Sequence, residues 1–196
     1  MKSTLHRRDV VKALLRDRKG LLVVAGLGST AWDITATGDA PLNFPLWGAM
    51  GNAAMIGLGL ALAQPARRVL VITGDGEMLM GMGSLATIGV QRPPDLTVEV
   101  IDNERYGETG MQATHTAAGA DLAKVALACG FRSARQVRAS GALAGLRRAI
   151  HGAPGPHLAQ VKVLAEKLPL VLPPREGVLL KARFRRALLG EDADLV

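Results

Sequence analysis

Residues 69–77 read Val-Leu-Val-Ile-Thr-Gly-Asp-Gly-Glu, an apolar run that stops at a Gly-Asp-Gly turn. A second apolar run, Leu96 to Ile101, is followed by Asp102 and Asn103. Short apolar runs of this kind, bounded by turn residues, are typical of buried strands in a parallel sheet. Because parallel strands end at the same edge of a sheet, we expect the oxygens of Asp75 and Asn103 to meet there. Such oxygens suit Mg²⁺, which usually accompanies phosphate groups.

The rest of the chain alternates between apolar runs and helical patterns, which predicts a three-layer α/β/α fold around a mostly parallel sheet. The expected strands are 21–25, 69–73, 96–101, 134–137 and 157–163. The expected helices are 4–18, 52–63, 78–90, 121–129 and 140–151, and a further helix follows the turn at 26–30 and continues through residue 34. Pro41 and Pro45 break the pattern. The loop from Tyr106 to Ala120 is long, and loops of that length tend to be functional.

With 196 residues, 48% of them apolar, the chain can bury one sizeable core. We expect one α/β domain over residues 1–167 and a tail over 168–196 that is Pro-rich and then basic. No second domain is visible, so any second domain must come from another chain. The single cysteine, Cys129, excludes a disulfide framework and a cysteine metal cluster. We expect it to be a buried structural thiol in a reducing, cytoplasmic compartment.

The formal net charge is +7, but the basic residues are scattered and do not alternate with aromatic residues, so nucleic-acid binding is not expected. Basic residues concentrate in the first twenty positions and near the end, which suits a partner surface or an anionic ligand. Residues 40–66 carry no charge. Their prolines, glycines and amides indicate a buried core or interface helix rather than a membrane span. The charged residues 6–9, with no apolar stretch after them, do not fit a signal peptide.

Two glycine-containing turns are candidate anion sites. Gly74 and Gly76 permit close approach of the backbone to phosphate oxygens, and the helix expected from Met78 directs its N-terminus to the same place. The other turn contains Ser29, and two interpretations of it stay open. In one, amides and hydroxyls of the turn hold a phosphate; in the other, the side chain of Ser29 or Thr30 caps the helix. This second turn lacks the third glycine of a dinucleotide-binding fingerprint, so a nicotinamide cofactor is not expected.

Several titratable residues stand near these motifs. His115 lies in the long loop, where it is either a substrate or proton contact or an exposed loop residue. Asp33, Asp39 and Glu108 are expected to be surface carboxylates, with Glu108 the nearest to the site. No serine nucleophile elbow or metalloprotease motif is present.

The motifs resemble those of a known family. The run from Gly74 to Asn103 resembles the thiamine diphosphate motif, which opens with Gly-Asp-Gly and closes with Asn, and Trp47 to Gly51 resembles the turn that grips the aminopyrimidine ring. Three stretches resemble sulfopyruvate decarboxylase beta subunits and phosphonopyruvate decarboxylases more closely. They are FPLWGAMGNAAMIGLGLALA at 44–63, GDGEMLMGMGSLAT at 74–87 and DNERYGETGMQATHT at 102–116. The resemblance extends over roughly residues 5 to 165 and implies a thiamine diphosphate-binding fold.

The resemblance also implies roles for individual residues. Magnesium would be held by the side chains of Asp75 and Asn103 and by the backbone carbonyl of Arg105. The residues implied to contact the cofactor are Gly74, Gly76 and Glu77 at the diphosphate, the Gly48 carbonyl at the 4′-amino group, and Met50 between the two rings. Ser29 in its turn and Tyr106 in the long loop are further candidate cofactor contacts. Some positions depart from the family pattern: Glu77 replaces a frequent Ser, Asp102 stands where many relatives have Asn, and Glu104-Arg105 replaces a smaller pair.

A glutamate that activates the cofactor in this superfamily belongs to a separate pyrimidine-binding domain, for which this chain has no room. The resemblance therefore implies a diphosphate-binding, beta-type subunit of a 2-oxo acid decarboxylase that acts on a small anionic substrate. It would need a pyrimidine-binding (alpha) subunit that supplies the glutamate, in a homo- and hetero-oligomer. Two alternatives stay open: a carboligase subunit similar to acetolactate synthase, and a non-catalytic thiamine diphosphate-binding or scaffolding subunit.

Overall fold

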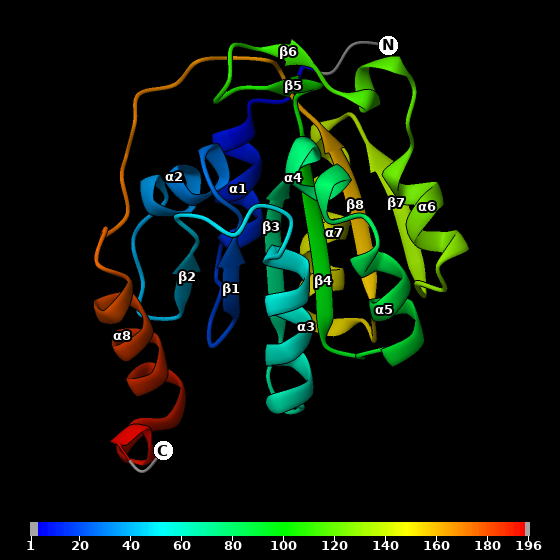
Figure 1. Cartoon of the computed structure of the whole chain (residues 1–196). Coiled ribbons are helices and arrows are strands. Elements are labelled where there is room, and N and C mark those ends of the chain that lie inside the picture. The colour runs from blue at the N-terminus through cyan, green and yellow to red at the C-terminus, as the bar shows by residue number, and fades with distance from the viewer. Residues whose placement is uncertain (1–3, 195–196) are drawn as a thin grey trace.

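The computed structural model describes residues 4–194, and its centre is a six-stranded parallel sheet (Figure 1). In spatial order the strands are β2 (Asn43–Pro45), β1 (Leu22–Ala25), β3 (Val69–Gly74), β4 (Leu96–Asp102), β8 (His157–Lys162) and β7 (Ser133–Val137). Every neighbouring pair is parallel. The expected α/β fold with a mostly parallel sheet is confirmed.

Helices cover both faces of the sheet and give the molecule its three layers (Figure 1). One apolar core lies under α1 (Arg7–Leu15), α2 (Ser29–Ala36) and α7 (Leu143–Gly152). The other lies under α3 (Ala53–Ala63), α5 (Ser84–Gln91), α6 (Leu122–Ala128) and α8 (Gly177–Leu189). The central strands β1, β3 and β4 are buried along almost their whole length, because both of their faces are covered.

The prediction of a single helix over residues 78–90 is wrong, because this stretch belongs to two helices. The first, α4 (Asp75–Met80), begins at the Gly-Asp-Gly motif itself, and α5 follows after Gly81 to Gly83. Gly81 packs on the backbone of Gly51, where an added Cβ would lie 2.0 Å from the Gly51 carbonyl oxygen. The chain therefore turns at the point where it meets the neighbouring loop.

The sequence did not predict β2 or α8. β2 is an edge strand, which is a position where a sheet tolerates proline. α8 lies within the segment expected to be only a basic tail, and it packs against β2, with the rings of Phe44 and Phe184 at 5.4 Å in an edge-on arrangement. The expectation of a buried Cys129 is wrong, since the residue is only partly buried.

The extended segment between β8 and α8 crosses the carboxyl edge of the sheet before it descends to α8 (Figure 1). It is attached at several places along its length. The amide of Leu164 donates to the Leu5 carbonyl at 2.9 Å, the Pro169 carbonyl accepts from Arg8 at 2.9 Å, and the Pro174 carbonyl accepts from Trp47 at 2.8 Å. Within residues 4–194 no helix is long and apolar enough to span a membrane.

The strand order creates a natural ligand site. From β1 the chain continues to β2 on one side, whereas β3 lies on the other side of β1. In open parallel sheets, ligands bind beyond the carboxyl ends of the strands at such a reversal of direction. The turns after β1 and β3, which contain Ser29 and Asp75, flank this point.

A buried carboxyl group lies within the sheet away from this edge. Glu99 in the middle of β4 is 1% exposed, and neither carboxyl oxygen has a hydrogen-bond partner within residues 4–194. Burial raises its pKa well above the ordinary value, and the charge of Arg135 opposes this only in part. The folded protein therefore holds the proton more tightly than the unfolded chain does, and stability falls as the pH rises through this raised pKa.

We expect Glu99→Gln to raise the melting temperature by several degrees at pH 8, because the variant has no carboxyl group to ionise. The gain should shrink towards pH 4.5, where the unfolded wild-type chain also binds the proton. Thermal unfolding at several pH values measures this, with the exposed Glu191→Gln as the control. An equal effect at all pH values would contradict the interpretation.

Candidate functional site

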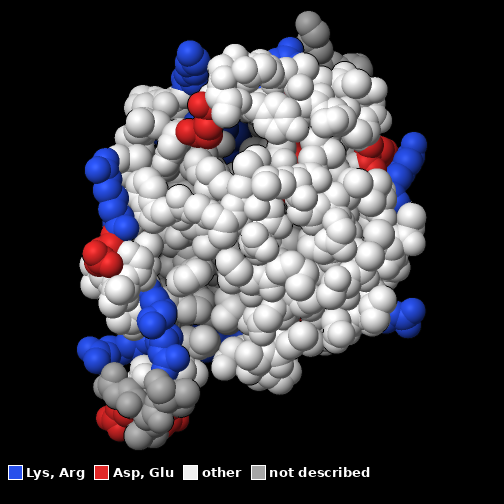
Figure 2. Space-filling view, viewed as in Figure 1, with Lys and Arg blue, Asp and Glu red and all other residues white. Residues whose placement is uncertain are grey.

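A cavity of about 490 Å³ lies at the carboxyl edge of the sheet. Its lining comes from the turns after β1 and β3, the end of β4, the loop from Asn103 to Met111, and the extended segment at 166–170. Figure 2 shows the opening near the top of the molecule, with basic atoms visible in its depth. The cavity therefore lies at the place that the strand order favours.

Asp75 lies in this cavity, directly after β3. Its side chain is almost completely buried, and one carboxylate oxygen accepts a hydrogen bond from Thr114 at 2.5 Å, with the Thr116 hydroxyl at 3.2 Å from the same oxygen. Burial first, and then the nearby charge of Asp102, raises the pKa of Asp75 to about 6, while the two threonine hydroxyls oppose the shift. Hydroxyl groups on one oxygen fix the direction in which the carboxylate points.

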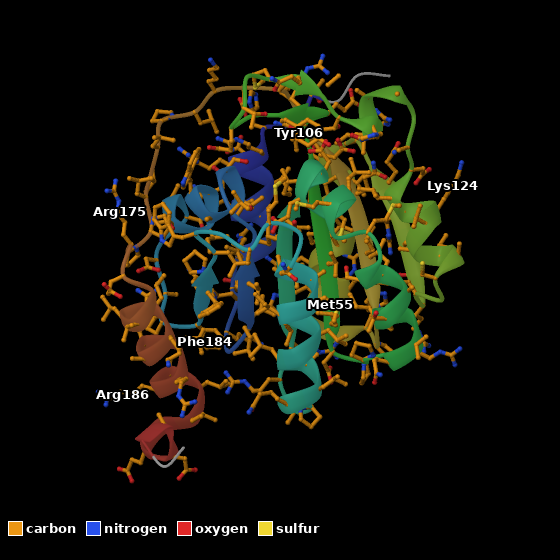
Figure 3. The ribbon with its side chains drawn as sticks, viewed as in Figure 1. Met55, Tyr106, Lys124, Arg175, Phe184 and Arg186 are labelled. Atoms are coloured by element: carbon orange, nitrogen blue, oxygen red, sulfur yellow. The ribbon has the colours of Figure 1, made fainter. Side chains whose placement is uncertain are left out.

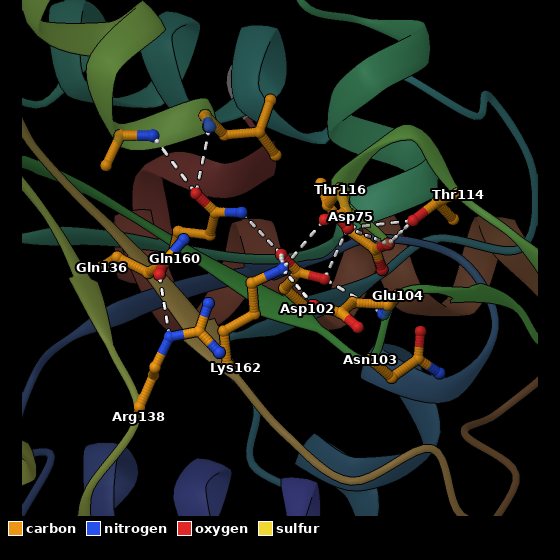
Figure 4. A network of polar contacts seen from close by, with 12 residues as sticks. Asp75, Asp102, Asn103, Glu104, Thr114, Thr116, Gln136, Arg138, Gln160 and Lys162 are labelled. Carbon is orange, nitrogen blue, oxygen red and sulfur yellow. Dashed lines mark hydrogen bonds and ion pairs between the residues drawn. The ribbon is translucent and has the colours of Figure 1, made fainter. Parts of the chain in front are cut away.

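Asp102 stands beside it at the end of β4 and is the centre of a buried polar network (Figure 4). One oxygen accepts from Thr116 at 2.8 Å, and the other accepts from Gln160 at 2.6 Å and lies 2.8 Å from the ammonium of Lys162. Lys162 also lies 2.7 Å from Glu104. Thr116 therefore connects the two carboxylates, and Lys162 supplies the positive charge that offsets Asp102.

Asn103 also lines the cavity, so the structure brings it together with Asp75 as the sequence predicted. Its side-chain oxygen accepts a hydrogen bond from the amide of Arg105 at 2.9 Å, across Glu104, whose φ of 61° is left-handed. Residues Arg105–Tyr106 form β5, which pairs antiparallel with β6 (Gln112–Ala113). This hairpin returns the chain to Thr114 and so closes the network over the strand ends.

The two glycines of the motif have different surroundings. Nothing lies within 4 Å of a Cβ built on Gly74, which borders the cavity, whereas a Cβ on Gly76 would lie 2.5 Å from the ring of Tyr106. Figure 3 shows Tyr106 at the carboxyl edge of the sheet. The missing side chain of Gly76 therefore makes room for Tyr106, a reason that the sequence did not reveal.

Glu77 lines the cavity, but its carboxylate is directed towards the protein. It accepts a hydrogen bond from Thr73 at 2.8 Å, and a Cβ on Gly26 would lie 1.6 Å from one of its oxygens. Burial raises its pKa, and the Thr73 hydroxyl and the backbone of Gly51 and Ala53 oppose the rise. Glu77 thus links the end of β3 to the turn before α3.

The other predicted cofactor residues differ in position. Ser29 lines the cavity as the first residue of α2, and the helix cap is Gly28, with no side-chain cap hydrogen bond. The alternative in which Ser29 or Thr30 caps the helix is therefore wrong; Thr30 instead donates to the Gly26 carbonyl at 2.8 Å. Met50 lines the cavity, whereas Gly48 is exposed and lies outside the lining.

The titratable residues singled out in the sequence also differ in whether they line the cavity. Glu108 lines the cavity, as expected, while His115 is exposed between the buried Thr114 and Thr116 and does not line it. The expectation of a surface position for Asp33 is wrong, because it is fully buried against two arginines.

Comparison with known proteins places this geometry in a family. A model described as "Thiamine pyrophosphate enzyme, C-terminal TPP binding domain" matches residues 32–161. The chain belongs to this family. The matched residues include β3, α4 and β4, so both carboxylates and Asn103 lie within the family's domain.

Several relatives of the chain are named decarboxylases. The chain is 39% identical to the sulfopyruvate decarboxylase beta subunit of Methanocaldococcus jannaschii, over 64% of this chain and 66% of that one. It is 40% identical to the beta subunit of Methanococcus maripaludis, over 66% and 69% of the two chains. It is 43% identical to a phosphonopyruvate decarboxylase of Streptomyces hygroscopicus, over 67% of this chain and 31% of that one.

Among solved structures, a thiamin diphosphate-dependent enzyme from Mycobacterium smegmatis superposes with a TM-score of 0.66 at 25% identity, over 80% of this chain and 31% of that chain. The chain thus spans about two thirds of the beta subunits and about a third of the longer relatives. These relatives support a subunit of a thiamine diphosphate-dependent decarboxylase.

We expect Lys162→Met to destabilise the fold by about 3–5 kcal/mol, because Asp102 would be left buried without its counter-charge. Adding Asp102→Asn should restore most of this loss, since the amide can still accept from Thr116. Urea unfolding of the two single variants and the double variant measures the coupling. A double variant no more stable than Lys162→Met would contradict this account.

Proposed function

We propose that this chain is the diphosphate-binding, beta-type subunit of a thiamine diphosphate- and magnesium-dependent 2-oxo acid decarboxylase. The observation that carries the proposal is the cavity in which Asp75 and Asn103 meet beyond β3 and β4. The names of the relatives suggest a substrate similar to sulfopyruvate or phosphonopyruvate.

The residues present fit a magnesium ion and a diphosphate. Asp75 and Asn103 offer a carboxylate and an amide oxygen, and the Arg105 carbonyl is the proposed third protein ligand; such oxygens are the donors that Mg²⁺ prefers. Burial, and then the charge of the neighbouring Asp102, raises the pKa of Asp75, and a divalent cation there would offset both effects. The space in front of Gly74 allows close approach to the backbone.

The cofactor, when bound, would supply the nucleophilic carbon and the electron sink that decarboxylation of a 2-oxo acid needs. The role of this chain is then to hold and orient it. Thr114 and Thr116 fix the Asp75 carboxylate, and Glu77 fixes the turn that contains Met50. We propose that Gly74, Gly76 and Ser29 contact the diphosphate, and that Gly48, Met50 and Tyr106 contact the rest of the cofactor.

We further propose that a partner chain supplies the pyrimidine-binding domain and its activating glutamate. Beta-subunit names among the relatives support this, and so does an exposed face without charges. Residues 40–66 and 78–91 contain no charged residue. Figure 2 shows an uncharged surface over α3 and α5.

Exposed apolar side chains lie on this uncharged face. They are Met55 and Leu62 on α3, Met80 on α4, Met82 in the following turn and Val90 on α5, of which Met80 and Val90 are 68% and 78% exposed. Figure 3 shows Met55 on the near side of α3. The face reaches the cavity through Met50, which is both exposed and part of the lining. A large apolar surface beside an active-site cavity is suited to a partner that completes the site.

To test the function, the chain is co-expressed with its pyrimidine-domain partner and assayed for aldehyde and carbon dioxide from 2-oxo acids, including sulfopyruvate and phosphonopyruvate. Decarboxylation of at least one acid supports the proposal. Formation of an acyloin or acetolactate instead of an aldehyde would favour carboligation. No turnover of any acid, with cofactor and magnesium bound, would contradict both activities and favour a non-catalytic subunit.

We expect Asp75→Ala to abolish magnesium-dependent binding of thiamine diphosphate, because the cavity loses its principal charged metal ligand. Calorimetric titration of the assembled protein measures the affinity. The exposed Asp17→Ala serves as the control and should bind like the wild type. Unchanged affinity in Asp75→Ala would refute the proposed metal site.

We expect the double variant Met55→Glu/Leu62→Glu to lose association with the partner chain, because charges on the uncharged face would be buried without counter-ions. Size-exclusion chromatography with light scattering measures the assembly. Val178→Glu, which introduces the same charge on the exposed side of α8, is the control. Dissociation of a homodimer with the partner still bound would instead assign the face to a second copy of this chain.

A further inference from the structure

Arg7 is a buried basic residue that has no role in the function proposed above. It is the first residue of α1, it is 5% exposed, and it lines the same cavity as Asp75. In the sequence it is one of the basic residues that concentrate in the first twenty positions. Arginine is almost never fully buried without a partner, so its position needs an explanation.

The guanidinium of Arg7 is poorly satisfied by the protein. One terminal nitrogen lies 3.5 Å from a carboxylate oxygen of Asp33, which is an ion pair without a hydrogen bond. The Nε atom is buried and has no hydrogen-bond partner within residues 4–194. Across this range no hydrogen bond to the guanidinium is present, although the group carries five donors.

The surrounding carboxylates do not satisfy the hydrogen-bond donors of the Arg7 guanidinium. Asp33 accepts a well-formed hydrogen bond from the neighbouring Arg8 at 3.0 Å, so it shares its charge between two cations. Glu166 also lines the cavity, but its oxygens lie 2.8 Å from the His6 ring and 3.3 Å from the Arg7 backbone amide. The guanidinium thus retains unused donors in the wall of a cavity, at a cost in desolvation that a bound anion would remove.

An oxyanion is the ligand that suits such a group. The planar fork of a guanidinium donates two parallel hydrogen bonds to phosphate, sulfonate or carboxylate groups. Ser29, at the N-terminus of the eight-residue helix α2, lines the same cavity, and the amides of a helix start also favour negative charge. Carboxylates line the cavity as well, but Asp75 and Glu77 are turned towards threonine hydroxyls.

We propose that Arg7 binds a phosphate- or sulfonate-type oxyanion in this cavity. The proposed function offers two sources of that group, the diphosphate of the cofactor and the second acid group of the substrate, and the inference rests on the proposed function only for this choice. In either case Arg7 is a binding residue on α1, remote in sequence from the Gly74–Asn103 motif.

The test is calorimetric titration of the full chain in its assembled form with two probes, inorganic pyrophosphate plus magnesium and sulfoacetate. Arg7→Gln is compared with Arg8→Gln. Both variants remove one positive charge and one partner of Asp33, but only Arg7 lines the cavity. We expect Arg7→Gln to weaken binding of at least one probe by about tenfold or more, and Arg8→Gln to change it less than about threefold.

Each outcome has a defined meaning. A loss confined to pyrophosphate assigns Arg7 to the diphosphate, and a loss confined to sulfoacetate assigns it to the acid group of the substrate. Unchanged affinity for both probes in Arg7→Gln, or an equal loss in Arg8→Gln, overturns the proposal. If Arg7→Gln does not fold, Arg7→Lys, which keeps the charge beside Asp33 but loses the fork, should weaken binding several-fold, and wild-type affinity in that variant overturns it.

These measurements are independent of turnover. Failure of the assembled wild-type protein to decarboxylate any 2-oxo acid would remove the proposed function but would leave the probe affinities, and so the oxyanion site, to stand or fall separately.

Discussion

Two carboxylates, Asp75 and Asp102, are held close together at the carboxyl edge of the sheet, and much of the surrounding structure serves to make this possible. Thr116 lies within hydrogen-bond distance of both, and Lys162 at the end of β8 supplies a counter-charge from below. The loop after β4 contributes both threonines, so it cannot move without disturbing the carboxylates. The loop, two strands and one buried cation therefore form a single unit.

The sequence predicted the sheet and its edge because these depend on local patterns. The runs before Gly74 and Asp102 are mostly apolar, with Thr73, Thr97 and Glu99 as exceptions, and this is the pattern of a strand covered on both faces. The same logic placed Asp75 and Asn103 in one cavity, since parallel strands end together. Family resemblance then supplied the cofactor, which composition and spacing could not have identified.

The features that sequence reasoning missed are those decided by distant contacts. Gly81 ends α4 where it meets the backbone of Gly51, and no residue near position 81 in the sequence predicts that contact. From the sequence, Asp33 is expected at the surface, but the fold places it on α2 against Arg7 at the start of α1, where both side chains are buried. Lys162 ends the buried strand β8, where only the position of Asp102 on the neighbouring strand explains a buried ammonium.

The attachments of the segment after β8 bear on how the protein can be shortened. From the sequence alone, residue 167 is a natural place to end a trimmed chain. A chain cut there would lose Leu168 and Leu170 from the cavity lining, the Pro169 carbonyl that Arg8 contacts, and the Phe184 ring that covers Phe44. Such a fragment could keep its sheet and its metal-binding motif while one side of its binding cavity stood open to water. The segment that completes the ligand cavity is thus the same one that leads to the C-terminal helix, although the cavity and the helix share no sequence motif.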